Sequence, residues 1–356
     1  MIQVRIQKQF APDVDSPAFS LHVDFAASAG ITVLFGPGGS GKTLTLDAIA
    51  GFVRPDQGRI LLDDDILFDG AAKVHLPSQS RNCGYVFHNY ALFPHMTLRQ
   101  NLSFAAERRP RLERHRKVNE MIEAFHLAEV AARLPGEVPR SQKQRCAIAR
   151  ALIGTPRLLL LDEPARGLDA FSKAELSSLL RRVRTDFGAQ VLLATDDLDG
   201  CFETGDEMLV YQNGRLIQTG SPRKVFEAPA SIEVARMLGK FNLLPAEIRA
   251  LDPARNYSRV RYETFDLTGP YFPGHLLGDK VWLCVRREQI RARGRDGKPG
   301  PNQIPVQLLR VVDSPGALRL EFAGEITAEM THAEYEKQKH NKEWLIEFPA
   351  EVLRVL

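Results

Sequence analysis

The fold of this chain is decided by the stretch Gly36-Pro37-Gly38-Gly39-Ser40-Gly41-Lys42-Thr43. It fits the pattern G-x-x-x-x-G-K-[ST], which marks a phosphate-binding loop where a strand precedes it and a helix follows it. Residues 31–35 are apolar and rich in β-branched side chains, which predicts a buried strand. Residues 44–50 predict a helix that ends near Gly51. Both flanks weigh against the alternative of a glycine-rich turn that binds nothing.

The composition of this loop predicts that it holds the phosphates of a nucleotide. Glycine tolerates unusual φ angles, so several backbone N–H groups can point at one anion. The following helix adds the partial positive charge of its N-terminus. Lys42 would reach the β- and γ-phosphates, and the Thr43 hydroxyl would bind Mg²⁺. We therefore predict that residues 36–43 bind ATP together with Mg²⁺.

The overall composition is that of an ordinary globular protein. The chain has 356 residues, enough for two domains, of which 44% are hydrophobic and 26% charged. A net charge of +3 is too small to predict a nucleic-acid partner. No apolar run approaches the ~18 residues of a membrane span, and residues 1–6 lack the apolar core of a signal peptide. The four cysteines are scattered, which predicts reduced thiols in the cytoplasm rather than disulfides or a zinc site.

Strands alternate with helices through the first two thirds of the chain, which predicts an α/β fold with a mostly parallel sheet. Apolar runs at 158–161 and 191–195 predict buried central strands. Asn213-Gly214 between two further strands predicts a hairpin. Other strands are expected at 2–7, 18–25, 59–62 and 84–87, and helices at 98–109, 114–133, 142–154 and 170–186.

The pattern changes near residue 240, where long helical periodicity stops. Short alternating segments follow, separated by turns rich in Gly and Pro, at 258–262, 280–286, 304–312, 317–322 and 344–348. We therefore expect residues 1–238 to form a nucleotide-binding domain, with a helical subdomain at about 88–155. Residues 239–356 are expected to form a small, barrel-like all-β domain, which leaves open that this domain consists of two related halves.

Two acidic residues close the apolar strand predicted at 158–161. Asp162 and Glu163 would lie at the carboxyl edge of the sheet, where open α/β folds bind ligands. A carboxylate there can hold Mg²⁺ through water, and an adjacent Glu can orient or deprotonate an attacking water. An acid pair of this kind can also cap a helix or lie in a surface turn. Its combination with the phosphate loop favours Asp162 as a metal ligand and Glu163 as a catalytic base.

Taken together, these elements resemble the ATP-binding subunit of ABC importers, and the resemblance covers nearly the whole chain. Residues 36–43 look like Walker A and residues 158–163 like Walker B. Residues 87–97 resemble the Q-loop segment, residues 142–152 the helix after the signature motif, and residues 167–169 the D-loop. The β domain is similar to the TOBE domain of importers for molybdate, sulfate, iron, polyamines and sugars.

The resemblance implies a mechanism and a set of partners. Two such subunits would face each other head to tail, with ATP between Walker A of one and the signature of the other. Their closure would drive a membrane permease, served by a solute-binding protein, from the cytoplasmic face of the inner membrane. Residues 90–94 would either lie near the groove for the permease or pack in the core. Phe10 is predicted to stack on adenine, since Phe19 could equally be a core residue.

Three positions depart from the pattern of this family. His88 stands where the Q-loop glutamine, a Mg²⁺ ligand and γ-phosphate sensor, is expected, and an imidazole matches that oxygen ligand poorly. Asp196 replaces the switch histidine, and a carboxylate about 4 Å from a γ-phosphate is repelled by about 4 kcal/mol at an effective dielectric of 20. Residues 138–142 (Val-Pro-Arg-Ser-Gln) replace the signature glycines. Since losing one aimed donor costs ~10²–10³ in rate, we expect retained ATP binding with weakened hydrolysis.

Two functions therefore stay open. The first is an importer ATPase subunit, and the second is a hydrolysis-impaired partner or regulatory subunit. The order of the motifs argues against a different phosphate-loop enzyme such as a kinase. Residues 30–37 look most like the molybdate branch, so molybdate or a related oxyanion is the predicted cargo, with sulfate, iron, polyamine and sugar as alternatives.

Overall fold

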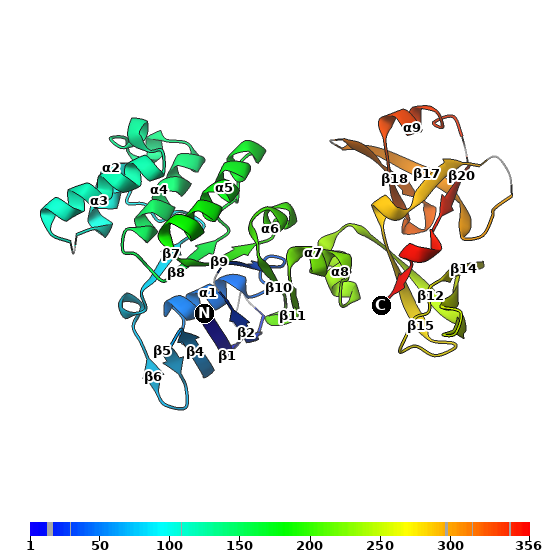
Figure 1. Ribbon diagram of the computed structural model, residues 1–356, viewed down its shortest axis with the longest axis horizontal. Coiled ribbons are helices and arrows are strands. Elements are labelled where there is room, and N and C mark those ends of the chain that lie inside the picture. Colours follow the sequence, from blue (N-terminus) through cyan, green and yellow to red (C-terminus); the bar gives the residue numbers. More distant parts are fainter. Residues whose placement is uncertain (13–16, 29, 108, 296–297, 315, 342) are drawn as a thin grey trace. The chain divides into compact units, whose positions relative to one another are not determined.

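The computed structural model describes residues 1–12, 17–28, 30–107, 109–295, 298–314, 316–341 and 343–356 (Figure 1). These residues form two compact units, which span residues 1–228 and 229–356. The first unit ends earlier than the predicted boundary after residue 238. The reason is that helix α8 (Ile232–Leu238) contacts strand β12 (Phe241–Asp252), so that it belongs to the second unit. No helix among the described residues is long and apolar enough to cross a membrane.

An 11-stranded sheet runs through the first unit in the order β6-β5-β4-β1-β2-β11-β10-β3-β9-β8-β7. Its strands are β1 (Ile2–Phe10), β2 (Phe19–Ala27), β3 (Ile31–Phe35), β4 (Gln57–Leu62), β5 (Asp65–Asp69), β6 (Val74–His75), β7 (Cys83–Val86), β8 (Leu158–Asp162), β9 (Gln190–Thr195), β10 (Glu207–Gln212) and β11 (Arg215–Gly220).

The central part of this sheet is parallel, and it carries the predicted site. Strands β10, β3, β9, β8 and β7 pair in parallel, whereas the strands around β1 pair antiparallel. Every residue of β3, β8 and β9 is buried, as expected for strands covered on both faces. The predicted α/β fold is confirmed, with a sheet that is mixed. The predicted hairpin is also confirmed, because Asn213 and Gly214 both have positive φ, as a type I′ turn requires.

Helix α1 (Lys42–Ala50) follows the phosphate loop and ends at Gly51, as predicted. Gly51 has a φ of 87°, and a Cβ atom there would lie 2.7 Å from Nε of Arg81. The guanidinium of Arg81 is fully buried and donates to the carbonyl oxygens of Ala48 and Ile49, each at 2.8 Å. A cation at these carbonyls satisfies groups that a helix end leaves without a partner. Arg81 therefore anchors the far end of the helix that carries Lys42.

The helices of the first unit gather mostly at one end of the sheet (Figure 1). They are α2 (Leu98–Ala105), α3 (Arg111–Ala124), α4 (Arg140–Leu152), α5 (Ala170–Phe187), α6 (Leu198–Thr204) and α7 (Pro222–Glu227). Helix α2 contacts both α3 and α4 within the predicted helical subdomain. The helix predicted at 114–133 is wrong at its end: His126 has a φ of 53°, which stops α3. Arg108, in the helix predicted at 98–109, lies outside the described residues.

The second unit consists of two five-stranded sheets, in the orders β14-β13-β12-β15-β21 and β16-β20-β17-β18-β19. Beyond β12, its elements are β13 (Tyr257–Tyr262), β14 (Phe265–Gly269), β15 (Lys280–Arg286), β16 (Arg291–Gly294), β17 (Gln303–Ser314), β18 (Ala317–Phe322), β19 (Thr327–Met330), α9 (His332–Glu336), β20 (Glu343–Glu347) and β21 (Arg354–Val355). Short 3-10 turns in the chain are Ser78–Ser80, Ala128–Val130, Pro135–Glu137, Arg287–Gln289, Ala323–Glu325 and Ala350–Val352.

The two sheets have the same strand order when they are traced along the chain. Four consecutive strands of each half form one sheet, and the fifth strand of each half joins the sheet of the other half. Two buried asparagines link the halves in matching ways. The Oδ1 atom of Asn242 accepts from Thr327 N at 2.7 Å, and that of Asn302 accepts from Thr268 N at 2.7 Å. The second unit is therefore an internal repeat with exchanged edge strands.

Candidate nucleotide site

The phosphate loop joins β3 to α1 and is shaped to receive an anion. Gly41 caps α1 with a φ of 104°, without a side-chain hydrogen bond and without an acidic residue in the first turn. The N–H groups at this helix end are therefore available to a ligand. A Cβ atom on Gly41 would lie 2.8 Å from Cδ1 of Leu21, so a larger residue would close the loop. The hydroxyl of Ser40 is buried, and it has no hydrogen-bond partner among the described residues.

Lys42 lies beneath this loop with only 4% of its surface exposed. Its Nζ atom donates to the carbonyl oxygens of Gly36 at 2.8 Å and Pro37 at 2.9 Å. Burial lowers the pKa of Lys42, and Glu163 and Asp196 are the strongest of the carboxylates that oppose this shift. A buried ammonium group whose hydrogen bonds among the described residues go to neutral carbonyls is suited to exchange one of them for a phosphate oxygen, which carries a full charge.

The three residues predicted to hold the metal lie together at the end of β8. Thr43 Oγ1 donates to Asp162 Oδ1 at 2.9 Å, and His88 Nδ1 lies 3.8 Å from Asp162 Oδ2. Asp162 is 3% exposed, and its burial raises its pKa while the bond from Thr43 opposes that shift. The hydroxyl and the carboxylate are oxygen donors that fit Mg²⁺, whereas the imidazole nitrogen does not.

One hydrogen bond joins strand β7, which precedes His88 in the chain, to helix α1. Tyr85 lies on β7, three residues before His88, and its hydroxyl donates to Asp47 Oδ1 at 2.8 Å. Asp47 is four residues after Thr43 and so lies on the same side of α1. Burial raises the pKa of Asp47. Our sequence analysis missed this pair, because a single Asp on a helix and a single Tyr on a strand carry no motif.

Glu163 faces the phosphate loop from the turn after β8. It has a φ of 46°, which is unusual for a residue other than glycine, and its N–H donates to Ala194 O at 2.9 Å. It lines a cavity together with Gly39, Ser40, Gly41, Lys42, Thr43, Leu44 and Phe19. Its Oε2 atom also accepts from Arg166 Nη1 at 2.9 Å. Glu163 therefore faces the same cavity as Lys42 and Thr43.

The aromatic residue that lines this cavity is Phe19, whereas our prediction was Phe10. The two residues are partners across the antiparallel strands β1 and β2. The ring of Phe19 reaches the phosphate loop, since its Cζ atom would lie 3.4 Å from a Cβ atom on Gly41. The ring of Phe10 instead lies 5.6 Å from Nζ of Lys8. The position of Phe19 beside the loop favours it as the residue that stacks on the base.

Replacing Phe19 by alanine is expected to lower the affinity for ATP about tenfold, because stacking a base on an aromatic ring contributes about 1–3 kcal/mol. Affinity for inorganic tripolyphosphate, which has no base, should not change. Both can be measured by calorimetry, with Phe10→Ala as the matched control. An equal loss of ATP affinity in Phe10→Ala, or an equal loss of tripolyphosphate binding in Phe19→Ala, would contradict the assignment.

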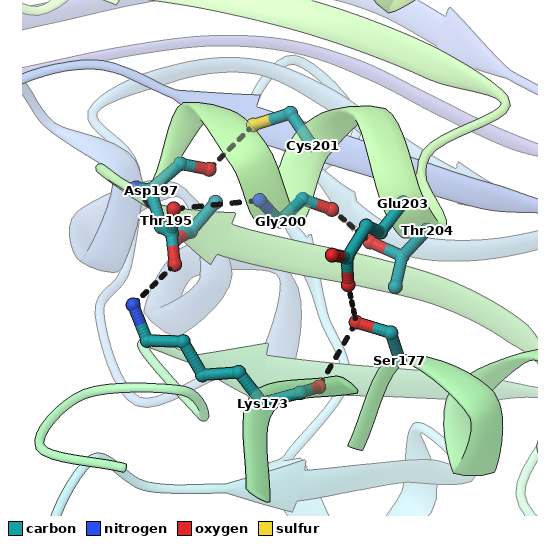
Figure 2. A network of polar contacts seen from close by, with 8 residues as sticks. All are labelled: Lys173, Ser177, Thr195, Asp197, Gly200, Cys201, Glu203 and Thr204. Atoms are coloured by element: carbon teal, nitrogen blue, oxygen red, sulfur yellow. Dashed lines mark hydrogen bonds and ion pairs between the residues drawn. The ribbon is translucent and has the colours of Figure 1, made fainter. Parts of the chain in front are cut away.

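Asp196 is exposed and directly follows β9, and its neighbours Thr195 and Asp197 take part in the polar contacts drawn in Figure 2. The carboxylate of Asp197 accepts from Lys173 Nζ of α5 at 2.6 Å and from Gly200 N of α6 at 3.4 Å. The N–H of Asp197 donates to Thr195 Oγ1 at 3.0 Å. Burial raises the pKa of Asp197, but Lys173 and the bond from Gly200 hold it below its usual value. This ion pair, which our sequence analysis missed, joins the switch position to the helix that follows the D-loop.

The residues in the signature position begin helix α4. Pro139 is the N-cap and supplies no side-chain hydrogen bond. Arg140 is exposed and donates from Nη1 to Gly167 O of the D-loop segment at 3.4 Å. A groove beside it is lined by His88, Asn89, Tyr90, Leu92, Pro94, Pro135, Gly136, Arg140, Lys143 and Arg166. The Q-loop, signature and D-loop segments therefore meet at one cationic surface.

Comparisons with known proteins agree with this arrangement. The ABC transporter family matches residues 21–166. The chain is 35% identical over 275 residues to the spermidine/putrescine import ATP-binding protein PotA of Vibrio cholerae, which covers 76% of this chain and 71% of that protein. It is 41% identical over 214 residues to the molybdate/tungstate import ATP-binding protein WtpC of Pyrococcus horikoshii, which covers 60% of each.

The fold of the first unit is also found in a solved structure. The ATP-binding cassette MJ0796, solved as a dimer in a post-hydrolysis state with ADP and phosphate, matches with a TM-score of 0.55 at 22% identity. The match covers 63% of this chain and 99% of that one. The chain therefore belongs to the ABC transporter family, in the group of import ATP-binding subunits.

Proposed function

We propose that this chain binds ATP as one of two ATP-binding subunits that drive the uptake of a small solute through a membrane permease. The observation that carries the proposal is that Lys42, Thr43 and Glu163 line one cavity and that Thr43 donates to Asp162 beside it. These residues come from helix α1, strand β8 and the turn after β8, and together they match what a nucleotide's terminal phosphates require: a buried ammonium, free N–H groups and a metal-holding carboxylate.

The residues of the site have separate roles in this proposal. Lys42 exchanges a carbonyl partner for a phosphate oxygen, and the loop N–H groups receive the rest of the phosphate charge. A divalent cation at Thr43 and Asp162 would neutralise part of the same charge. Glu163 orients the attacking water, since it lines the cavity and its other contact, Arg166, is largely exposed. Phe19 holds the base.

A second subunit completes the site in this proposal. Phe171 follows the D-loop and is 74% exposed, which is unusual for a phenylalanine and favours an interface there. The cationic groove at Arg140, Lys143 and Arg166 lies on the segments that the sequence analysis assigned to the head-to-tail contact. The related cassette named above forms a dimer in its solved structure.

The permease would dock on a groove of the helical subdomain. This docking groove is lined by His95, Met96, Gln100, Ser103, Phe104, Glu107 and Arg114. Phe104 is 49% exposed, and its ring packs edge-on against Phe93 with centroids 4.8 Å apart. Residues 90–94 therefore support the wall of the groove, in line with the first of the two interpretations of this apolar stretch. A largely exposed aromatic ring in a groove suits an apolar helix of a partner.

The proposal is tested by co-purification with the cognate permease. Phe104→Glu is expected to lower recovery of the complex at least about tenfold, because it places a charge in the apolar contact. ATP affinity should not change. Leu112→Glu, which alters an 86% exposed leucine outside the docking groove, is the matched control. Equal recovery of the Phe104→Glu and Leu112→Glu complexes would contradict docking at this groove.

The cargo that we propose is molybdate or a related oxyanion, on the likeness of residues 30–37 to the molybdate branch. The two relatives named above carry different cargoes in their names, so uptake of labelled molybdate and of putrescine should be compared directly. A solute-binding protein would select the cargo, the second unit would act as a TOBE-like regulatory domain, and the subunit would lie peripherally at the cytoplasmic face of the inner membrane.

Two observations favour a second candidate, a subunit with impaired hydrolysis. Asp196 adds a third carboxylate that interacts electrostatically with Lys42, beside Glu163 and Asp162. Arg140 and Pro139 replace backbone donors at the start of α4 with a bulky side chain and a residue that has no N–H. Such a subunit would bind ATP and would depend on a partner subunit for turnover.

A further inference from the structure

His88 places a nitrogen atom beside Thr43 and Asp162, the residues predicted to hold the metal, where the family pattern has an oxygen ligand. Its Nδ1 atom lies 3.8 Å from Asp162 Oδ2, while Thr43 Oγ1 contacts the other oxygen of that carboxylate, Oδ1, at 2.9 Å. The imidazole is 56% exposed and the carboxylate 5%, so the ring borders the open side of the site. One hydroxyl oxygen, one carboxylate and one imidazole nitrogen therefore surround the same position.

The position of His88 is fixed by contacts on both sides along the chain. Before it, the rings of Tyr85 and Phe87 pack with centroids 4.3 Å apart, and Phe87 stacks on Phe52 at 5.7 Å. After it, Arg150 of α4 donates to Ala91 O at 2.7 Å and to Tyr90 O at 3.1 Å, in a turn where both residues have positive φ. These contacts restrict the backbone on both sides of His88. The imidazole therefore needs little rearrangement of the chain to reach the site.

The chemistry of this donor set does not match Mg²⁺. Mg²⁺ prefers oxygen ligands in near-ideal octahedral geometry and gives up water reluctantly. Imidazole nitrogen is a borderline donor that favours first-row transition metals, and affinity for such sites rises from Mn²⁺ through Fe²⁺ and Co²⁺. Carboxylate and phosphate oxygens accept these ions as well. A site with one nitrogen among oxygens therefore discriminates against Mg²⁺ without excluding the nucleotide.

We propose that His88 makes this ATP site selective for a divalent transition metal such as Mn²⁺ or Co²⁺ over Mg²⁺. The inference rests on the proposed function, because the metal is taken to bind with the nucleotide between Thr43 and Asp162. The competing possibility is that a protonated His88 forms an ion pair with Asp162 and supplies the positive charge that the metal would otherwise supply. In that case ATP would bind without any divalent ion.

The test compares metals in the full-length chain with a nucleotide that is not hydrolysed. Affinity for AMP-PNP is measured by calorimetry with Mg²⁺, Mn²⁺ or Co²⁺, and with EDTA. We expect the affinity ratio of Mn²⁺ to Mg²⁺ to fall at least about tenfold in His88→Gln, as for the loss of one ligand interaction. AMP-PNP has its own preference among these metals, but this preference is the same for both chains and therefore cancels when their affinity ratios are compared. His115→Gln, which alters an exposed histidine on α3, is the matched control.

A spectroscopic measurement gives a readout that is independent of affinity. Pulsed electron paramagnetic resonance of Mn²⁺ with AMP-PNP should show ¹⁴N coupling from a bound imidazole in the unaltered chain and in His115→Gln. The coupling should be absent in His88→Gln. If the ratio of Mn²⁺ to Mg²⁺ affinity is equal in all three chains and no ¹⁴N coupling is seen, the inference is overturned and the proposed function stays intact. Binding in EDTA as strong as with metals would also overturn it. No binding under any condition would overturn both.

Discussion

Replacing Lys42 by alanine is expected to weaken ATP binding by at least about 100-fold. The Nζ atom of Lys42 is buried, and among the described residues it donates to the carbonyl oxygens of Gly36 and Pro37. A hydrogen bond to a charged group contributes about 1.5–3 kcal/mol, so two such bonds to phosphate account for at least about 3 kcal/mol, which is a factor of about 100. No neighbouring side chain can replace this charge.

The loss is measured by calorimetry with AMP-PNP. Lys224→Ala, which alters an exposed lysine on α7 of the same unit, is the control and should bind as the unaltered chain does. Circular dichroism establishes that both variants are folded. A Lys42→Ala chain that keeps its affinity within about threefold would show that the nucleotide does not sit on this loop, and the proposed function would then fail.

Repairing the altered positions is expected to raise steady-state phosphate release by about 100-fold. The repaired chain carries His88→Gln, Asp196→His, Pro139→Ser, Arg140→Gly and Ser141→Gly. It restores a donor at the γ-phosphate, removes a repelling carboxylate and lets the start of α4 approach the phosphate. One well-aimed donor alone contributes ~10²–10³ in rate, and effects of residues that act together need not add.

Phosphate release is measured with the permease present, since the resemblance places turnover in the assembled transporter. Glu163→Gln in the repaired chain is the control and should abolish the gain, because Glu163 lines the cavity at the phosphate loop. If the unaltered chain already releases phosphate as fast as the repaired one, His88, Asp196 and the start of α4 do not limit hydrolysis, and the impaired-subunit candidate is excluded.

Local patterns allowed the phosphate loop and the hairpin to be predicted from sequence. In each case a few adjacent residues set the backbone: Gly51 ends α1, and Asn213-Gly214 makes the turn. The proximity of Thr43 and Asp162 was also predictable, because each belongs to a motif whose context specifies where it lies. Signals of this kind do not depend on how distant elements pack.

Other features depend on packing that no short pattern encodes. The choice between Phe10 and Phe19 depends on which of two paired strands reaches the loop. Strand β12 was not predicted, since Pro245 interrupts its alternation, yet Pro245 lies opposite Trp282 of β15. The pair Lys173–Asp197 joins residues 24 positions apart in the chain, and only the packing of α5 against α6 brings them together.

The exchange of edge strands in the second unit has a consequence for synthesis on the ribosome. Sheet β14-β13-β12-β15-β21 draws its last strand from residues 354–355, after every other strand of the unit has been made. Strand β16 emerges early but has no sheet to join until β20 follows. Neither half can complete its sheet without a strand from the other half, so the nascent chain keeps unpaired strand edges, and a premature stop before β20 leaves both sheets unfinished.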